Sequence, residues 1–253
     1  MSREQKDREL KSVHIEAFDL DDAWFQCLSE ILEHGYVYKI DRGSYAGQCR
    51  LEFDFVTVNI KNPAHQIIPI IPEGSGIPAP TSMDYIQQYL QYLLTSCKTE
   101  SEDYTYGERL VDPKVKVETE SDGKKMTKEM PLQCNQIEEV IKMYKTQGFG
   151  TNQAVMEIGM PSDLKLIDPP CLRLIDTRVR YGKLHFFLYF RSWDLWGGFP
   201  SNLGGLELVK QYMAEEIGVE NGEIIACSKG LHLYDYVWEL AKQRTGKSDL
   251  KIE

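Results

Sequence analysis

The chain of 253 residues is 42% hydrophobic and 27% charged, and its formal net charge is -10. That length and composition suit a folded protein with a substantial core, and we predict a single domain over residues 1–253. The acidic balance argues against nucleic acid as a partner, because non-specific binding to nucleic acid relies on basic surface. A few arginines can still form a local pocket for a small anion.

The cysteines and the first residues bear on metal binding and on where in the cell the protein works. Six cysteines include no C-x-x-C pair and no His/Cys cluster with zinc spacing, so we predict no metal site. The first ten residues, "MSREQKDREL", are charged where a signal peptide is apolar, and no apolar run approaches the roughly 20 residues of a membrane helix. We therefore expect a cytoplasmic protein with reduced thiols and no membrane partner.

The first half of the chain combines helical and strand-like patterns. Apolar spacing predicts a helix over residues 21–34 that stops at Gly35. Residues 51–60 alternate first on one face and then on the other, so we expect a bulge or a twist there. Residues 81–96 have helical spacing, with Thr81 or Ser82 as the N-cap.

The second half continues the mixture. Residues 135–145 have the spacing of an amphipathic helix. The glycines of "WGGFPSNLGG" predict a loop, followed by a helix that ends at Gly218. Residues 231–243 also look helical. Strands and helices do not alternate regularly, which predicts the α+β class.

The hairpin "DPPCLRLIDTRVRYGKLHFFLYFRSWD", residues 168–194, carries the first indication of chemistry. With its turn at residues 181–183, Cys171 and Arg191 fall at the same end of an antiparallel ladder. A nearby arginine favours the thiolate, which is the nucleophilic form of cysteine. The guanidinium can also hold a phosphate through two hydrogen bonds, and Ser192 can add a third. Taken singly, a cysteine is more often a small buried hydrophobe and an arginine a surface ion pair.

Four ordered motifs resemble the thymidylate synthase family. In order they are "PPC", "GKL", "YFRSWDLWGGFPSN" and "GLHLYDY". The first resembles the family's Pro-Cys nucleophile, the third contains both its R-S-x-D segment and its Gly-x-Pro-x-Asn loop, and the fourth contains its His-x-Tyr sugar clamp. The resemblance is strong over residues 168–240. Nearer the start, "KIDRGSYAG" resembles the family's phosphate loop and "YTYGERL" its Tyr-Gly segment. The pattern is most similar to the archaeal-type branch.

The resemblance implies a fold, a reaction and a set of roles. The fold is a mixed β-sheet with flanking helices, in a homodimer that packs sheet to sheet. The reaction is that of a methyltransferase: Cys171 adds to C6 of deoxyuridylate, and a reduced pterin supplies the methyl group without any metal. That pterin is 5,10-methylenetetrahydrofolate or methylene-tetrahydromethanopterin. By the family's pattern, Arg42, Arg191 and Ser192 hold the phosphate, Asp194 contacts the ring through its backbone, Asn202 reads the base, His232 and Tyr234 bind the sugar, and Tyr106 assists proton transfer near C5.

Several of these residues also have purely structural interpretations. Asn202 alone is more readily a helix N-cap, because a helix is predicted soon after it. Its amide nevertheless offers one donor and one acceptor that match the uracil O4 and N3–H. Without the motif, His232 is an ordinary helix side chain and Tyr234 a core aromatic. Tyr106 is equally well an aromatic residue of a strand or turn.

The sequence departs from the family's pattern in three places. The family's S-R-R segment, which reaches the phosphate from the partner subunit, is replaced by "FGTNQAVME". The water-ordering glutamate has no clear counterpart, and Glu73 is the candidate, with a plain loop acid as its alternative. Leu172 follows the nucleophile where better-known members have histidine. Two other functions therefore stay open: a pyrimidine nucleotide hydroxymethylase acting on dUMP or dCMP, and a non-catalytic nucleotide-binding homologue.

Overall fold

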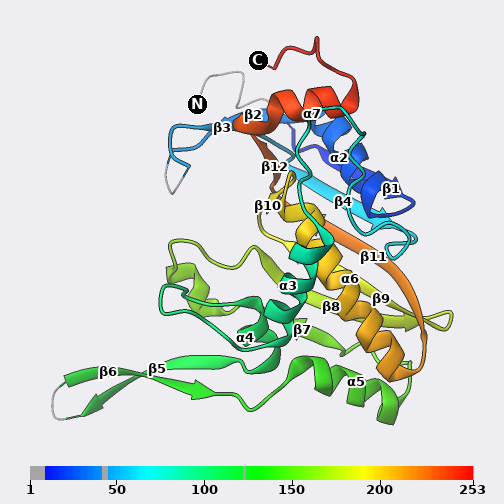
Figure 1. Ribbon diagram of the computed structural model, residues 1–253. Coiled ribbons are helices and arrows are strands. Elements are labelled where there is room, and N and C mark those ends of the chain that lie inside the picture. Colours follow the sequence, from blue (N-terminus) through cyan, green and yellow to red (C-terminus); the bar gives the residue numbers. More distant parts are fainter. Residues whose placement is uncertain (1–8, 42–44, 122–123, 253) are drawn as a thin grey trace.

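A six-stranded mixed sheet forms the centre of the computed structural model, which describes residues 9–41, 45–121 and 124–252 (Figure 1). In spatial order its strands are β1 (Ser12–Ala17), β4 (Phe55–Ile60), β11 (Glu220–Ser228), β9 (Lys183–Phe190), β8 (Leu172–Arg180) and β7 (Val155–Glu157). The pairs β1/β4 and β11/β9 are parallel and the other pairs are antiparallel. The predicted α+β fold, a mixed sheet with flanking helices, is confirmed.

Two smaller sheets complete the strands. One has the order β10 (Trp193–Asp194), β12 (Leu231–Tyr234), β3 (Cys49–Glu52) and β2 (Tyr36–Lys39). The other is the hairpin of β5 (Lys114–Ser121) and β6 (Lys124–Pro131), which extends away from the central sheet in Figure 1. The four-stranded sheet matters for function because β10 follows directly after β9, so the two sheets meet at the end of the 168–194 hairpin.

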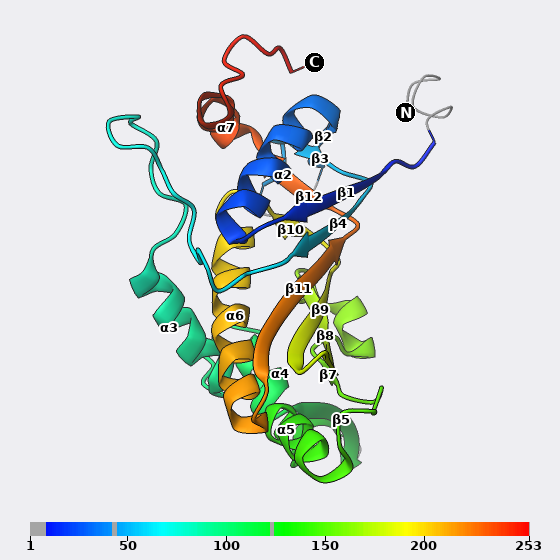
Figure 2. The same cartoon turned by 90° about the vertical axis from the view of Figure 1, so that its right-hand side faces the viewer.

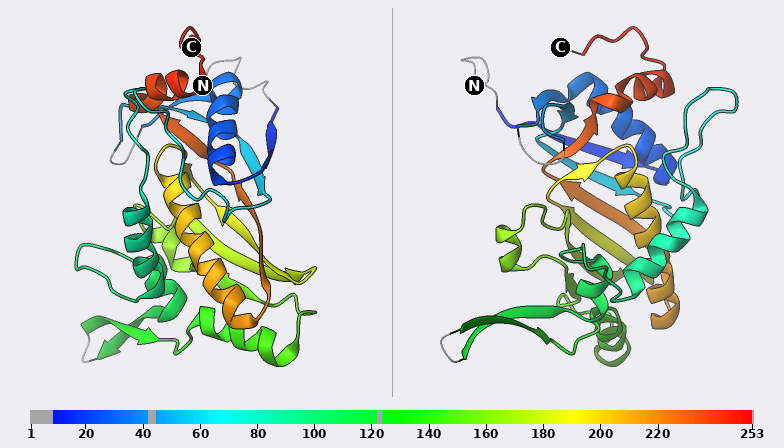
Figure 3. Two further views of the ribbon diagram at one scale, coloured as in Figure 1. Left: turned by 45° about the vertical axis from the view of Figure 1, so that its right-hand side comes forward. Right: turned by 60° about the vertical axis from the view of Figure 1, so that its left-hand side comes forward.

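Helix α6 (Gly198–Ile217) packs along one face of the six-stranded sheet, against β9 and β11 (Figure 2). Helix α3 (Met83–Leu94) lies beside α6, and the two views in Figure 3 place both helices on the same side of the sheet. The remaining helical segments are α2 (Leu20–His34), α4 (Tyr106–Val111), α5 (Gln136–Gln147), α7 (Trp238–Thr245) and the 3-10 turns η1 (Pro161–Lys165) and η2 (Asp235–Val237). In the described part of the chain, no helix combines the length and apolarity that crossing a bilayer requires.

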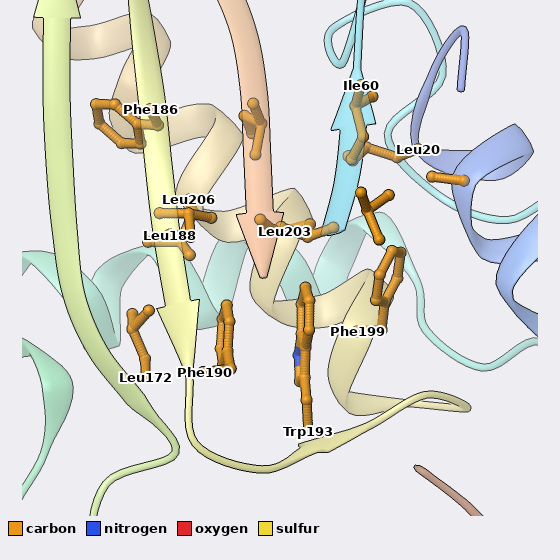
Figure 4. Close-up of a cluster of buried hydrophobic side chains, with 14 of the residues drawn as sticks. Leu20, Ile60, Leu172, Phe186, Leu188, Phe190, Trp193, Phe199, Leu203 and Leu206 are labelled. Atoms are coloured by element: carbon orange, nitrogen blue, oxygen red, sulfur yellow. The ribbon is translucent and has the colours of Figure 1, made fainter. Parts of the chain in front are cut away.

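The core lies between the sheet and α6. Figure 4 shows Phe186, Leu188 and Phe190 of β9 facing Leu203 and Leu206 of the helix, and all five are buried. The side chains of β9 alternate between this core and the opposite face of the sheet, as a strand requires. This packing fixes the end of β9, from which the chain continues into Arg191 and Trp193.

Four local helix signals are confirmed by the structure. Helix α2 ends at His34 with Gly35 as its C-cap, and Ser82 rather than Thr81 caps α3 by accepting from the Tyr85 N–H. In α5, the predicted apolar face of Ile137, Val140, Ile141 and Tyr144 is buried. Gly218 ends α6 in the left-handed conformation, at φ +83°. Each of these signals depends on residues within one or two turns, which explains their success.

The predicted loop at "WGGFPSNLGG" is wrong from Gly198 onward, because residues 198–205 form the first turns of α6. The glycines permit close packing instead of a loop. A Cβ on Gly204 would come within 2.4 Å of Ile86 Cδ1, and one on Gly205 within 2.5 Å of Tyr89 Cδ1, so both allow α3 to approach α6. Helix propensity is overridden here by tertiary contact.

Two strand assignments also differ from expectation. Residues 231–234, predicted as helix, form β12 because they pair with both β3 and β10. The change of face within residues 51–60 is neither a bulge nor a twist. Strand β3 ends at Glu52 and β4 begins at Phe55, and the two strands belong to different sheets. Neither pairing can be read from a local pattern, since the partners are distant in sequence.

Candidate functional site

Cys171 is positioned by the β8–β9 hairpin. The two-residue turn Tyr181–Gly182 has φ values of +52° and +74°, as a type I′ turn requires, and it joins Arg180 to Lys183. The ladder shifts register between Leu172 and Leu174. At its far end the Arg191 N–H donates to the Cys171 carbonyl oxygen at 2.8 Å. The hairpin thus brings the cysteine and the arginine together, as their spacing predicts.

The Arg191 side chain holds the segment that precedes the cysteine. Its Nε donates to the carbonyl oxygens of Pro169 and Pro170 at 3.1 and 3.2 Å, and its Nη2 pairs with Asp168 Oδ1 at 2.9 Å. These bonds fix the backbone on which the Cys171 thiol is mounted. Because 28% of the Arg191 side chain remains exposed, the guanidinium is also accessible to a ligand.

Burial raises the pKa of the Cys171 thiol, and the positive charge of Arg191 acts in the opposite direction. Asp168 adds to the increase, while Arg173 lowers the pKa. The predicted effect of the arginine therefore has the right sign, but desolvation outweighs it. The isolated protein holds a half-buried thiol whose ionisation depends on Arg191.

A cavity of about 430 Å³ is formed by residues of α3, α4, α6 and the segment between α3 and α4. It is lined by five tyrosines and three other polar side chains: Tyr85, Tyr89, Tyr92, Tyr104, Tyr106, Gln88, Glu102 and Asn202. Burial raises the pKa values of Tyr104 and Tyr106, and the negative charge of the Cys171 thiolate raises them further. The Tyr106 hydroxyl also accepts the Leu172 N–H at 3.2 Å, which ties α4 to the strand of the nucleophile.

Asn202 lies inside α6 and lines the same cavity, so its interpretation as an N-cap is wrong. Its Oδ1 accepts a hydrogen bond from Trp193 Nε1 at 3.1 Å, and its Nδ2 donates to the Tyr89 hydroxyl at 2.8 Å. The structure therefore brings Tyr106 and Asn202 to one cavity, and Cys171 directly precedes Leu172, whose N–H is bonded to Tyr106 in the cavity wall.

Asp194 lies on β10, and its side chain binds the N-terminus of α6. Its Oδ2 accepts the N–H groups of Gly197 and Gly198 at 3.0 and 2.8 Å, and its Oδ1 accepts that of Trp196 at 3.3 Å. A carboxylate is stabilised by the helix dipole at this position. Ser192 is half-buried next to Gly230, whose added Cβ would lie 3.7 Å from the Ser192 Cα.

His232 and Tyr234 lie on β12, where His232 pairs in register with Asp194. His232 is 3% exposed, and burial together with the charge of Arg50 lowers its pKa to about 4, so the ring is neutral at pH 7. Its Nδ1 donates to the Gly230 carbonyl oxygen at 2.9 Å, which leaves Nε2 as an acceptor. That Nε2 is buried without a partner among the described residues, so it can still accept a hydrogen bond. Tyr234 stacks on Tyr45 with ring centroids 4.4 Å apart.

Comparison with known proteins decides the family. A model described as thymidylate synthase matches residues 96–251. A Methanosarcina mazei protein named "Putative thymidylate synthase" is 31% identical over 230 residues, which cover 90% of this chain and 92% of that protein. The chain belongs to the thymidylate synthase family. The resemblance predicted from the four motifs is confirmed at this level.

Two further comparisons extend the relationship. A thymidylate synthase of Listeria monocytogenes is 31% identical over 119 residues, which cover 47% of this chain and 38% of that protein. The solved structure of thermostable thymidylate synthase A from Bacillus subtilis aligns with a TM-score of 0.64, covering 90% of this chain and 84% of that one at 17% identity. The second likeness shows a shared fold.

Sequence reasoning missed two charged residues beside His232. On β3, Glu52 lies opposite His232 and Arg50 opposite Tyr234. Arg50 pairs with Glu52 at 2.5 Å, and the Tyr36 hydroxyl donates to the same carboxylate at 2.8 Å. The available signal was the charge alternation within the apolar segment "CRLEFDF", since buried charges on a strand need a partner or a ligand.

Two further residues named from the thymidylate synthase pattern are Arg42 and Glu73. Arg42 lies outside the described residues. Glu73 is exposed in the turn Pro72–Ser75, and the acid that lines the tyrosine cavity is Glu102. The cavity also presents the Gln88 amide from α3. The exposed position of Glu73 favours its interpretation as a plain loop acid.

Proposed function

We propose that this protein is a thymidylate synthase that converts deoxyuridylate to thymidylate, with a methylene-carrying reduced pterin as the source of carbon and hydride. One arrangement carries the proposal: the Arg191 N–H is bonded to the Cys171 carbonyl, and the next residue, Leu172, is bonded to Tyr106, which lines one cavity with Asn202. A nucleophile, a cation for a phosphate and a pair of polar groups for a base are thereby available to one nucleotide.

The covalent step would begin at sulfur. The Cys171 thiolate adds to C6 of the uracil, and the electrons of the C5–C6 bond move to O4 as an enolate. One carbon–nitrogen bond of the pterin's methylene bridge breaks as the bridge opens, and C5 bonds to the methylene carbon. The C5 proton then leaves and the second carbon–nitrogen bond breaks, which leaves an exocyclic methylene group on C5. A hydride from the pterin ring reduces the exocyclic methylene group while the sulfur–C6 bond breaks, which gives thymidylate and a dihydropterin. Covalent addition activates a carbon that is otherwise inert.

The remaining residues would orient the nucleotide. Arg191 and Ser192 bind the phosphate, with Arg42 from outside the described residues, and Asp194 offers its backbone to the ring. His232 Nε2 accepts the hydrogen of a sugar hydroxyl, and Tyr234 donates to the same group. The buried and unpartnered state of Nε2 supports this role. Asn202 pairs with the base, and Tyr106, kept protonated by its raised pKa, holds a hydrogen bond near C5.

The tyrosine cavity would receive the pterin. A cavity of about 430 Å³ with several aromatic walls suits a flat heterocycle, because ring stacking and a few convergent polar groups are typical of such sites. Gln88 and Glu102 supply polar groups at its wall. A folate and a methanopterin share this ring system, so either fits the proposal.

We also propose a homodimer built on the open face of the six-stranded sheet, with each chain a single domain. The face opposite α6 carries Leu174, Phe187, Tyr189 and Ile225, which alternate with core residues and are half-buried or exposed. Apolar side chains on an uncovered sheet favour a second copy of the same sheet. Sedimentation or light scattering of the purified protein measures this directly.

The reaction is tested with deoxyuridylate tritiated at C5 and methylene-tetrahydrofolate or its methanopterin counterpart. A synthase releases tritium and forms one dihydropterin for each thymidylate. A hydroxymethyl nucleotide with unoxidised pterin would identify a hydroxymethylase, and no tritium release with either pterin would indicate a non-catalytic homologue. With 5-fluoro-deoxyuridylate and the pterin, mass spectrometry should find the adduct on the peptide that contains Cys171. An adduct on Cys134 or Cys227 would reject the assigned nucleophile.

A further inference from the structure

The side chain of Asn202 is held between two partners of different chemistry. On one side the Trp193 indole donates to Oδ1 at 3.1 Å, and on the other side Nδ2 donates to the Tyr89 hydroxyl at 2.8 Å. Each partner uses one hydrogen-bonding position of its atom. One lone pair on Oδ1 and one N–H on Nδ2 therefore remain for a ligand in the cavity.

Only one of these partners can decide which way the amide faces. An indole N–H donates and cannot accept, so the amide oxygen must face Trp193. A phenol hydroxyl both donates and accepts, and Tyr89 would therefore tolerate either atom of the amide. A rotation of the amide by 180° would set the Asn202 NH₂ against the Trp193 N–H, leaving two donors opposed in a buried site.

Trp193 itself is fixed by packing. It is 2% exposed, and its ring is stacked on Phe190 with centroids 3.9 Å apart and an angle of 3° between the planes. Phe199 lies 4.5 Å away on α6, and Figure 4 shows the indole standing between these two rings. The indole N–H therefore keeps its direction toward Asn202.

We propose that Trp193 is a positioning residue that locks the Asn202 amide in the orientation that selects uracil over cytosine. This inference rests on the proposed function, in which Asn202 meets the base. Uracil presents N3–H and O4, a donor and an acceptor, which match the free acceptor on Oδ1 and the free donor on Nδ2. Cytosine presents an acceptor at N3 and a donor at N4, so its pairing needs the rotated amide that Trp193 forbids.

The test compares Trp193→Phe with the matched control Tyr89→Phe. Trp193→Phe keeps an aromatic ring beside Phe190 but removes the indole N–H donor. Tyr89→Phe removes the hydroxyl that can pair with either atom of the Asn202 amide. The dissociation constants of dUMP and dCMP are measured for each protein by calorimetry. We expect the dissociation constant of dCMP divided by that of dUMP to fall about tenfold or more in Trp193→Phe. Without the indole N–H, no buried donor opposes the rotation of the Asn202 amide. In Tyr89→Phe both constants change together and the ratio stays at its wild-type value.

A second measurement does not depend on nucleotide binding. The indole N–H resonance of Trp193, assigned by its loss in Trp193→Phe, should exchange slowly with solvent and should shift in Asn202→Leu, which removes the acceptor. A wild-type ratio retained in Trp193→Phe, or an indole resonance unmoved in Asn202→Leu, overturns the inference while leaving the proposed synthase intact. A wild-type protein that binds neither nucleotide overturns the proposed function and base selection with it.

Discussion

Cys171, Arg191 and His232 come from the ends of strands, whereas the tyrosines of the cavity come mainly from two helices, α3 and α4, and the segment between them. A backbone ladder fixes the position of each strand-borne residue. The helical side distributes one surface over five aromatic rings. We therefore expect single substitutions to be severe on the strand side and mild on the helical side, and the predictions below test that contrast.

The largest effect is expected for Cys171→Ala. Removing the nucleophile should lower turnover by at least about a thousandfold while dUMP still binds, because the covalent step is lost and the binding groups are not. Tritium release and calorimetry measure the two quantities. Cys134→Ala is the matched control and should keep wild-type turnover; equal losses in the two variants would contradict the assignment.

Arg191→Ala should follow, with kcat/KM reduced about a hundredfold or more. The variant loses charged hydrogen bonds to the Pro169–Pro170 backbone as well as the proposed phosphate contact, and each is worth about 1.5–3 kcal/mol. Arg180 stands at the opposite end of the same hairpin and is exposed, so Arg180→Ala serves as the control. The charge of Arg191 also lowers the pKa of Cys171, so the pH midpoint of iodoacetamide alkylation should move upward in Arg191→Ala.

His232 should make the stability of the protein depend on pH. Its folded pKa of about 4 lies below the ordinary value, so the unfolded chain binds this proton first. The contribution of His232 to the free energy of unfolding is complete above about pH 6.5, and it falls by a few kcal/mol in all as the pH drops toward 4. Urea unfolding measured at several pH values should show that the free energy of unfolding changes less with pH in His232→Gln than in the wild type. Parallel slopes would mean that the ring is not held neutral by burial.

On the helical side, Tyr106→Phe should have the strongest effect, because it alone among the tyrosines accepts the Leu172 N–H in the described structure. Losing that acceptor should lower the free energy of unfolding by about 1–3 kcal/mol. Tyr104→Phe, at the same cavity, is the control and should cost less. If Tyr104→Phe proved as harmful as Cys171→Ala, the contrast between the two sides would fail.

The smallest effect belongs to Glu73→Gln. The residue is exposed in a turn, and such substitutions change stability by no more than about 0.5 kcal/mol. Turnover should also remain at the wild-type level. Loss of tritium release in this variant would place Glu73 back in the reaction and would require the loop to reach the cavity.

What could be predicted from the sequence follows the range of the interactions involved. The meeting of Cys171 and Arg191 is a local property of one hairpin, so its spacing predicts it. The pairing of Arg50 and Glu52 with β12 joins segments about 180 residues apart, and it is invisible until the sheet is known. The tyrosine cavity was missed for a different reason, since tyrosines at helical spacing are usually core residues. The proposed role of Asn202 at the base rests on its motif alone, because helical spacing predicts that the helix containing it starts later.

The tight turn at Tyr181–Gly182 has a consequence for anyone who alters this protein. Two residues with positive φ set the phase of the whole hairpin, and side chains on a strand change face with each residue of slip. An epitope tag or a fluorescent label inserted at this exposed tip would look harmless, since Tyr181 is 94% accessible to solvent. Odd-length insertions would nevertheless threaten the alignment of a thiol about ten residues away, so the tip tolerates chemical conjugation at the tyrosine better than any change in its length.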